Sequence, residues 1–261
     1  MGARFILNVA SRFSLVYKVE GADAQSYCFA TPNQLTLWRA KTFFEKEPET
    51  LEWIDGFLPD SVFYDIGANV GLYTVYAAKG GKVKSVISFE PESGNYALLN
   101  RNIALNSLQD SVSALNVALS DKVSLDTLYL YDASPGAALH SFGEAGVYIQ
   151  DVRRTPHKQG AISFSLDRFV AEFSPPFPNY IKIDVDGLEA KIIAGAGTLL
   201  ADRRLKGMLI EIDETHVGDV SLVEALKKHG FMPEKKKHSA MVAAGDCTGS
   251  SNYIFTRNQA G

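Results

Sequence analysis

The sequence predicts an α/β protein built on a doubly wound, mostly parallel sheet. Its first long apolar run, residues 62–66, is followed by a glycine-spaced turn and then by apolar residues at helical spacing. Two later apolar runs, residues 84–89 and 179–185, end in or beside acidic residues. Strands that alternate with helices pair in parallel, so their carboxyl ends lie along one edge of the sheet, where ligands bind. We therefore expect a ligand site at this edge.

The composition favours small-molecule chemistry over work on nucleic acid. The 261 residues are 46% apolar, which supports a sizeable core. Lys and Arg number 26 against 30 Asp and Glu, and the net charge of −4 gives no electrostatic footprint for nucleic acid or an anionic membrane. No apolar run approaches the roughly 18 residues of a membrane span, and the first residues are too weakly apolar for a secretory signal. Cys28 and Cys247 form no C-x-x-C pair, which is typical of a reducing compartment, so a cytoplasmic protein is expected.

The first part of the chain, residues 1–58, is predicted to form a small hairpin and a helical cap. Two β-rich runs, 13–19 and 25–30, flank a short polar turn, and residues 32–57 then follow a helical pattern of apolar residues. Aromatic residues in that pattern are typical of a core. Residues 59–261 are expected to form the main domain.

The turn after the first strand of that domain follows the pattern D-x-G-x-N-x-G, from Asp65 through Gly67 and Asn69 to Gly71. A dinucleotide fingerprint has glycine where Asn69 stands, because the pyrophosphate approaches the backbone there. An amide suits a ligand with hydrogen-bonding groups, and Asp65 would repel phosphate and attract an ammonium group. S-adenosylmethionine (SAM), with its amino group and sulfonium, has this polarity. Gly67 and Gly71, with Ala68 between them, would let a ligand approach the backbone; a turn that merely uses small residues is the alternative.

The next two strand ends extend this predicted cofactor site. Pro91 keeps Glu90 extended at the tip of the second strand, about 20 residues after the glycine turn, where an acid accepts hydrogen bonds from ribose hydroxyls. A capping or solvated carboxylate is the alternative role. The third strand, 112–117, leads into a segment that usually lies beside adenine in this architecture, so Asn116 and Ala118 are further candidates.

Residues 125–164 have the weakest pattern. Alternation at 128–131 indicates a strand, but residues 133–146 are rich in Gly, Ala and Ser and include His140. A long insertion at the carboxyl edge of a sheet is typical of a lid or substrate loop. A solvated loop histidine is the alternative to a functional one.

The fourth strand, 179–185, carries Lys182 and Asp184 in a run that should be buried on both faces. Charges there must be paired or lie at the open end. An ion pair with a structural role would explain a buried Lys182. Asp184 lies beside the crevice and is a candidate for a functional role. A fifth strand at 207–212 and a closing antiparallel pair, 241–244 with 253–255, complete the prediction.

Four motifs occur in order: D-x-G-A-N-x-G from Asp65, F-E-P from Phe89, N-V-A-L-S-D from Asn116 and I-K-I-D-V-D-G from Ile181. With them, roughly residues 60–215 resemble the FkbM family of SAM-dependent methyltransferases. Where that family commonly has K-I-D-V-E-G, this chain has an aspartate in place of the glutamate, which shortens the reach of the carboxylate.

The resemblance implies a Rossmann-like, seven-stranded sheet whose last two strands form an antiparallel hairpin. It also implies methyl transfer from SAM to a hydroxyl of a sugar, glycan or polyketide-type molecule. Residues 65–71 would then surround the methionine end of SAM, Glu90 would bind the ribose, and Asp184 would lie where donor and acceptor meet.

An alcohol acceptor needs a base to take its proton as the new bond forms. Asp184 is the first candidate, followed by His140 and His216. A Mg²⁺ ion held by Asp184, Glu211 and Asp213 is an alternative that we do not favour. The rival functions are a nicotinamide-dependent oxidoreductase, against which the missing middle glycine argues, and a SAM- or nucleotide-binding module without transferase activity.

Overall fold

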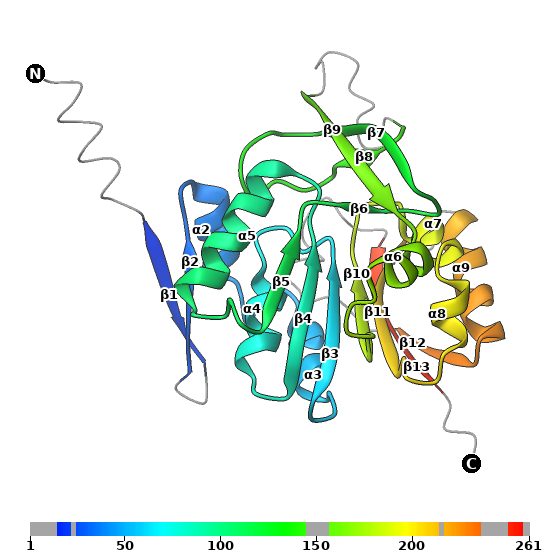
Figure 1. Ribbon diagram of the computed structural model, residues 1–261. Coiled ribbons are helices and arrows are strands. Elements are labelled where there is room, and N and C mark those ends of the chain that lie inside the picture. The colour runs from blue at the N-terminus through cyan, green and yellow to red at the C-terminus, as the bar shows by residue number, and fades with distance from the viewer. Residues whose placement is uncertain (1–14, 22–24, 145–156, 214–216, 236–249, 258–261) are drawn as a thin grey trace, which may run out of the picture.

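The computed structural model describes residues 15–21, 25–144, 157–213, 217–235 and 250–257. Its centre is a seven-stranded sheet in the order β12-β13-β11-β10-β3-β4-β5 (Figure 1). In chain order the strands are β3 (Ser61–Ile66), β4 (Val83–Phe89), β5 (Val112–Leu115), β10 (Tyr180–Ile183), β11 (Gly207–Asp213), β12 (Phe231–Lys235) and β13 (Ser250–Arg257). Pairs among β5, β4, β3, β10 and β11 are parallel, whereas β13 runs antiparallel to β11 and β12. The expected seven-stranded α/β sheet is confirmed as a mixed sheet.

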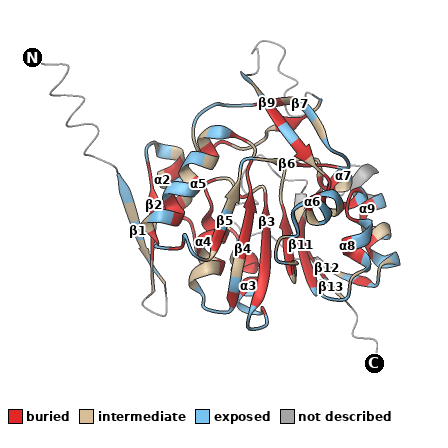
Figure 2. Cartoon of the chain, in the orientation of Figure 1, coloured by how far each residue is buried: buried red, intermediate tan, exposed pale blue. Residues whose placement is uncertain are grey.

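Alternate side chains of β3 enter two separate cores, one on each face of the sheet (Figure 2). Tyr64 and Ile66 pack with α6, α7, α8 and α9, and Phe63 packs with α3, α4 and α5. These helices are α3 (Pro48–Asp55), α4 (Leu72–Lys79), α5 (Ser93–Leu105), α6 (Leu166–Phe173), α7 (Glu189–Ala194), α8 (Gly197–Ala201) and α9 (Val217–Lys228). Burial on both faces explains why β3 is a continuous apolar run. None of the described helices has the length and apolar character to cross a membrane.

The N-terminal segment forms the predicted hairpin, β1 (Val16–Glu20) with β2 (Ser26–Ala30), followed by α2 (Gln34–Lys41) and α3. Two asparagines, one in α5 and one that caps its carboxyl end, hold this hairpin in place. Asn102 accepts a hydrogen bond from the Ala30 N–H at 2.7 Å and donates to the Val70 carbonyl at 2.7 Å. Asn106 makes a matching pair of bonds with the N–H and carbonyl of Cys28. Side chains of β2, α2 and α3 belong to the same core as α4 and α5, so this segment shares its core with the main sheet.

A second, four-stranded sheet lies over the carboxyl ends of the main strands (Figure 1). Its order is β6-β9-β7-β8, with β6 (Ala118–Leu119), β7 (Ser124–Leu130), β8 (Ser141–Phe142) and β9 (His157–Phe164). The strand indicated by the alternation at 128–131 is present as β7. The rest of this sheet was not predicted, because β7 finds its main partner, β9, only after a long intervening segment.

The closing pair of the main sheet differs from the prediction. Residues 253–255 do lie in β13, but the strand that pairs with them is β12, residues 231–235. Since β11 occupies the other side of β13, the predicted pairing with residues 241–244, which lie outside the described residues, was wrong. Pro233 is tolerated because β12 is the edge strand, where a missing N–H faces away from the sheet.

Candidate functional site

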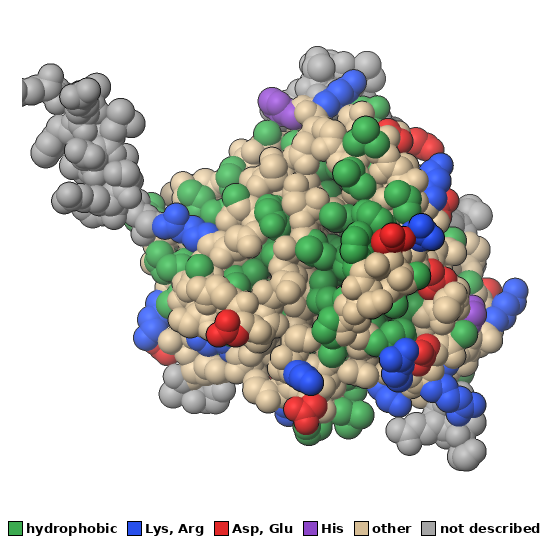
Figure 3. Space-filling view, in the orientation of Figure 1, with side chains coloured by type: hydrophobic (Ala, Val, Ile, Leu, Met, Phe, Trp, Pro, Cys, Tyr) green, Lys and Arg blue, Asp and Glu red, His purple; other side chains and the backbone are tan. Residues whose placement is uncertain are grey.

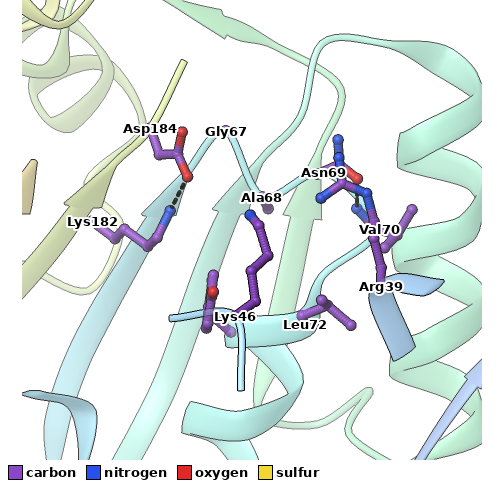
Figure 4. Close-up of a pocket in the computed structure, with 10 residues that line it drawn as sticks. Arg39, Lys46, Gly67, Ala68, Asn69, Val70, Leu72, Lys182 and Asp184 are labelled. Atoms are coloured by element: carbon purple, nitrogen blue, oxygen red, sulfur yellow. Dashed lines mark hydrogen bonds and ion pairs between the residues drawn. The ribbon is translucent and has the colours of Figure 1, made fainter. Parts of the chain in front are cut away.

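A pocket opens at the carboxyl ends of β3 and β10 (Figure 4). The space between its lining atoms is about 360 Å³, which includes open solvent. Four segments line it: the N-terminal cap, the loop after β3, the first residues of α4 and the end of β10. The lining residues are Arg39, Lys46, Gly67, Ala68, Asn69, Val70, Leu72, Tyr73, Lys182 and Asp184.

The loop after β3, residues 67–71, turns through left-handed backbone. Gly67, Asn69 and Gly71 have φ values of 78°, 50° and 83°. A Cβ on Gly67 would lie 1.9 Å from the carbonyl oxygen of Asp184, and one on Gly71 would lie 2.4 Å from Cδ1 of Leu99. Contacts inside the protein therefore require both glycines, in agreement with the tight turn expected at these positions, and the approach of a ligand to their backbone stays a prediction.

Glu90 lies at the end of β4, with its carboxylate buried against this loop. One oxygen accepts the N–H of Asn69 at 2.8 Å, and the other accepts the N–H of Glu92 at 2.8 Å. Burial raises the pKa of Glu90 to about 8 even though these two donors favour the ionised form. The amide of Asn116 donates to the carbonyls of Glu90 and Pro91, both at 2.9 Å. The structure thus brings the predicted cofactor residues of β4 and β5 together beside Asn69.

Six predicted cofactor residues are not among those that line the pocket: Asp65, Gly71, Glu90, Pro91, Asn116 and Ala118. Asp65 is buried below the loop, where its Oδ2 accepts the hydroxyl of Thr74 at 2.6 Å and its Oδ1 has no partner among the described residues. Burial raises the pKa of Asp65, while the positive charge of Lys182 opposes this change. Ala118 lies in β6, in the small core of the second sheet.

A buried network of charges stands behind the other wall of the pocket. The Nζ of Lys182 lies 2.6 Å from Oδ2 of Asp184, and the exposed fractions of the two side chains are 1% and 30%. Although burial disfavours the ammonium form, the carboxylates of Asp184, Glu47 and Asp65 hold the pKa of this lysine above its usual value. Burial would raise the pKa of Glu47, but Lys46 and Lys182 hold it below its usual value. The pairing expected for Lys182 is present, and Asp184 is the member of the network that faces the pocket.

Residues 132–140, which we call the covering segment, pass over the glycine loop. The carbonyl of Ala137 accepts a hydrogen bond from the side chain of Asn69 at 2.7 Å. The N–H of Leu139 donates to Oδ2 of Asp186 at 2.6 Å. Burial and a neighbouring carboxylate raise the pKa of Asp186 to about 6. The aspartate that departs from the family pattern therefore holds the covering segment.

His140 ends the covering segment and is not among the pocket's lining residues. Both of its ring nitrogens are buried without a hydrogen-bond partner among the described residues. Burial lowers its pKa, so the neutral imidazole is favoured. His216, the other histidine candidate, lies outside the described residues.

The described residues contain no group of three His, Cys, Asp or Glu side chains arranged to hold a metal ion. Asp184, Glu211 and Asp213 are all described, and they do not form the alternative Mg²⁺ cluster.

The prediction missed two cations that line the pocket, Arg39 of α2 and Lys46 of the turn before α3. The available signal was weak. Arg39 lies four residues after Leu35 and four before Phe43, so a positive charge sits at helical spacing within an apolar stripe.

Comparison with known proteins gives a family match over most of the main sheet. The family described as "Methyltransferase FkbM domain" matches residues 65–233, which is more than half of the chain. The methyltransferase sdnD of Sordaria araneosa is 26% identical over 159 residues, which are 53% of this chain and 61% of sdnD. The 31-O-demethyl-FK506 methyltransferase FkbM of Streptomyces tacrolimicus is 26% identical over 194 residues, 66% of this chain and 73% of that protein.

One solved structure supports the same fold. The methyltransferase FkbM from Methylobacillus flagellatus KT aligns with a TM-score of 0.54 at 13% identity, over 85% of this chain and 55% of that one. The chain thus spans less than two thirds of the length of sdnD and of the Methylobacillus protein.

Proposed function

Because the chain belongs to the FkbM family of methyltransferases, we propose that it transfers the methyl group of SAM to a hydroxyl of a sugar, glycan or polyketide-type small molecule. The observation that carries this proposal is the pocket in which the glycine loop faces the carboxylate of Asp184. A relative named for methyl transfer to 31-O-demethyl-FK506 supports an oxygen acceptor.

The residues around the pocket fit SAM. Glu90 has a buried carboxyl group beside the glycine loop, and in its ionised form each oxygen would have a second lone pair to accept a ribose hydroxyl. The loop and the cations of the N-terminal cap would hold the amino-acid part. When bound, SAM supplies a methyl group activated by its sulfonium. The task of the protein is then to align the acceptor oxygen with that methyl group and to exclude water.

Asp184 is the base that we propose for the acceptor hydroxyl. Its Oδ2 is held by Lys182 at 2.6 Å, and its Oδ1 has no hydrogen-bond partner among the described residues. This geometry fixes the direction of the carboxylate and leaves one oxygen to take a proton at the pocket. His140 is the second candidate, because its lowered pKa favours the neutral form that accepts a proton.

A small-molecule acceptor is supported by the charge distribution. On the face shown in Figure 3, Lys and Arg side chains are scattered among Asp and Glu side chains. The net charge of −4 agrees with this mixture and does not favour the phosphates of a nucleic acid. We also propose a cytoplasmic location, because the two isolated cysteines are typical of a reducing compartment.

Two measurements test the proposal against its rivals. Thermal shifts with SAM, S-adenosylhomocysteine (SAH) and NAD distinguish a methyltransferase from an oxidoreductase, and we expect SAM and SAH alone to raise Tm. Transfer of a labelled methyl group to a panel of sugars, glycans and polyketides distinguishes an enzyme from a binding module. Stabilisation by NAD alone, or SAM binding without turnover on any hydroxyl acceptor of the panel, would contradict the proposed function.

A further inference from the structure

The N-terminal cap contributes two positive side chains to a pocket that otherwise belongs to the methyltransferase sheet. Arg39 and Lys46 line it together with the glycine loop (Figure 4). Both residues precede the segment matched by the family, residues 65–233. Their role must therefore come from this chain's own geometry.

Arg39 differs from the other two cations of the pocket. Lys182 lies 2.6 Å from a carboxylate oxygen of Asp184, and Lys46 lies 2.6 Å from one of Glu47. Arg39 has no carboxylate within salt-bridge distance among the described residues. Its Nε donates to the Gly136 carbonyl at 2.7 Å, and its two terminal nitrogens have no hydrogen-bond partner in the described parts of the chain.

The bond to the Gly136 carbonyl anchors the Nε of Arg39. Burial lowers the pKa of Arg39 although nearby carboxylates oppose this change. The partly buried position therefore disfavours the charged guanidinium, which forms no ion pair with the described residues. A planar guanidinium with two free nitrogens matches the two oxygens of a carboxylate. An anion in the pocket would offset the cost of this partly buried charge.

We propose that Arg39, assisted by Lys46, binds the α-carboxylate of the methionine part of SAM. This inference rests on the proposed function. The buried carboxylate of Glu90 accepts the Asn69 N–H, which places the ribose position beside Asn69. Arg39 lies near Asn69 and Val70, whereas Asp184 lies at the other end of the pocket with Lys46 between them (Figure 4). The donor's carboxylate thus binds at the Arg39 end, and the acceptor hydroxyl meets the methyl group at the Asp184 end.

The assignment makes residues 33–47 part of the donor site. Arg39 also holds the covering segment through Gly136, and the side chain of Asn33 donates to the Pro135 carbonyl at 2.8 Å. The same cap therefore supports the covering segment and presents the carboxylate ligand. Binding of SAM should depend on the cap even though the cap lies outside the family match.

The test compares SAM with decarboxylated SAM, which keeps the adenosine, the sulfonium and the amine but lacks the carboxylate. Affinities are measured by calorimetry for the wild-type protein, Arg39→Met and the control Lys41→Met, which removes an exposed cation from the end of the same helix. We expect Arg39→Met to weaken SAM by about 10- to 100-fold, the loss typical of a charge-assisted hydrogen bond. Affinity for decarboxylated SAM should change by less than about threefold, and Lys41→Met should alter neither ligand.

Three results would overturn the inference. An equal loss for both ligands would mean that Arg39 acts only through the covering segment. Unchanged SAM affinity with a raised KM for the acceptor would assign the cation to the acceptor. Arg39→Lys keeps the charge but loses the planar fork, and it replaces Arg39→Met if that variant does not fold. If the ratio of SAM affinity to decarboxylated-SAM affinity in Arg39→Lys equals the ratio in the wild-type protein, the paired geometry is excluded. Absence of SAM binding in the wild-type protein is a different outcome, because it would contradict the proposed function itself.

Discussion

Glu90 links the proposed cofactor site to pH. Its carboxyl group is buried, and its pKa is raised to about 8, so the folded protein binds a proton there that the unfolded chain releases at a much lower pH. A group whose pKa is raised by folding stabilises the protein fully at pH values below its unfolded-state pKa. This contribution is lost as the pH rises to the folded-state pKa. For a glutamate this window runs from about pH 4.3 to about pH 8.

We therefore expect Tm of the ligand-free protein to fall between pH 6.5 and pH 8.5, and Glu90→Gln to remove most of that fall. The neutral amide keeps the shape of the protonated acid but has no proton to lose. The pKa of Asp186 is raised to about 6, so its contribution to stability is already mostly lost near the lower end of this pH range. Differential scanning fluorimetry at half-unit pH steps checks the expectation. Parallel Tm curves for the two proteins over that range would contradict it.

Asp184 is the residue on which the proposed chemistry depends. We expect Asp184→Asn to keep SAM affinity within a few-fold and to lower saturated kcat by about 10² to 10⁴, because the amide cannot take the proton of the acceptor. A drop in Tm should accompany the change, since the buried Lys182 loses its closest carboxylate.

Asp202→Asn is the matched control for Asp184→Asn. Its side chain has the same 30% exposure and also pairs with a cation, Arg204 at 2.7 Å, but the pair lies on the surface. The control should leave kcat and Tm nearly unchanged. If kcat of Asp184→Asn stays within threefold of wild type in single-turnover and steady-state assays, the base must be sought at His140 or His216.

Helix α5 is the element that joins the N-terminal hairpin to the glycine loop. Asn102 lies fully buried on this helix and bridges the Ala30 N–H and the Val70 carbonyl. Each of these backbone groups would be left unpaired by a shorter side chain, at a cost of about 1–3 kcal/mol per buried group.

Asn102→Ala should therefore lower the free energy of unfolding by about 2 kcal/mol or more. Asn100→Ala, the same chemical change at an exposed position of the same helix, should stay within about 0.5 kcal/mol of wild type. Urea unfolding followed by circular dichroism measures both. Equal midpoints for the two variants would show that the hairpin is held by its apolar contacts alone.

The covering segment is the second element that joins distant parts of the chain. Asn95 of α5 accepts the Gly136 N–H at 2.7 Å and donates to the Ala137 carbonyl at 3.1 Å. Together with the bonds from Arg39 and Asn69, these contacts hold residues 132–140 over the glycine loop. The segment is thus held by contacts from the cap, the glycine loop and α5.

At the scale of the whole molecule, one core of the main sheet includes residues from both sides of the predicted boundary at residue 58. Tyr27, Phe29 and Phe43 from the cap pack in the same core as Phe63 and Val75 from the main sheet. Edge-to-face contacts join the cap's aromatic rings to Tyr76 of α4. The division into residues 1–58 and 59–261 stays a prediction about organisation, but the shared core implies that the larger part depends on the smaller.

We expect residues 59–261 alone to lose cooperative thermal unfolding and to bind the dye ANS, because the removal of the cap exposes an apolar face of α4 and α5. Expression of this fragment beside the full chain, followed by calorimetry and ANS fluorescence, tests the expectation. A fragment with a sharp unfolding transition and no dye binding would show that the cap is an independent addition.

Local patterns were sufficient to predict the parallel strands of the main sheet and the edge at which the pocket lies. The turn from Asp65 to Gly71, the acid at Glu90 and the charges of β10 each follow from neighbouring residues, and the structure brings their strand ends to one edge. The roles of particular side chains needed more than this local information. Asp65 has the expected position in sequence, yet it is turned away from the pocket to a buried bond with Thr74.

Contacts between distant residues decided the rest. Arg39 meets Gly136 across 97 positions, Leu139 meets Asp186 across 47, and the second sheet pairs β7 with β9. Such contacts leave no periodic signal, because each depends on how two separate segments pack on the same sheet edge. Hence the strand ends at the pocket edge could be predicted from the sequence, whereas the positions of the cap, the covering segment and Arg39 at that edge were decided only by the tertiary structure.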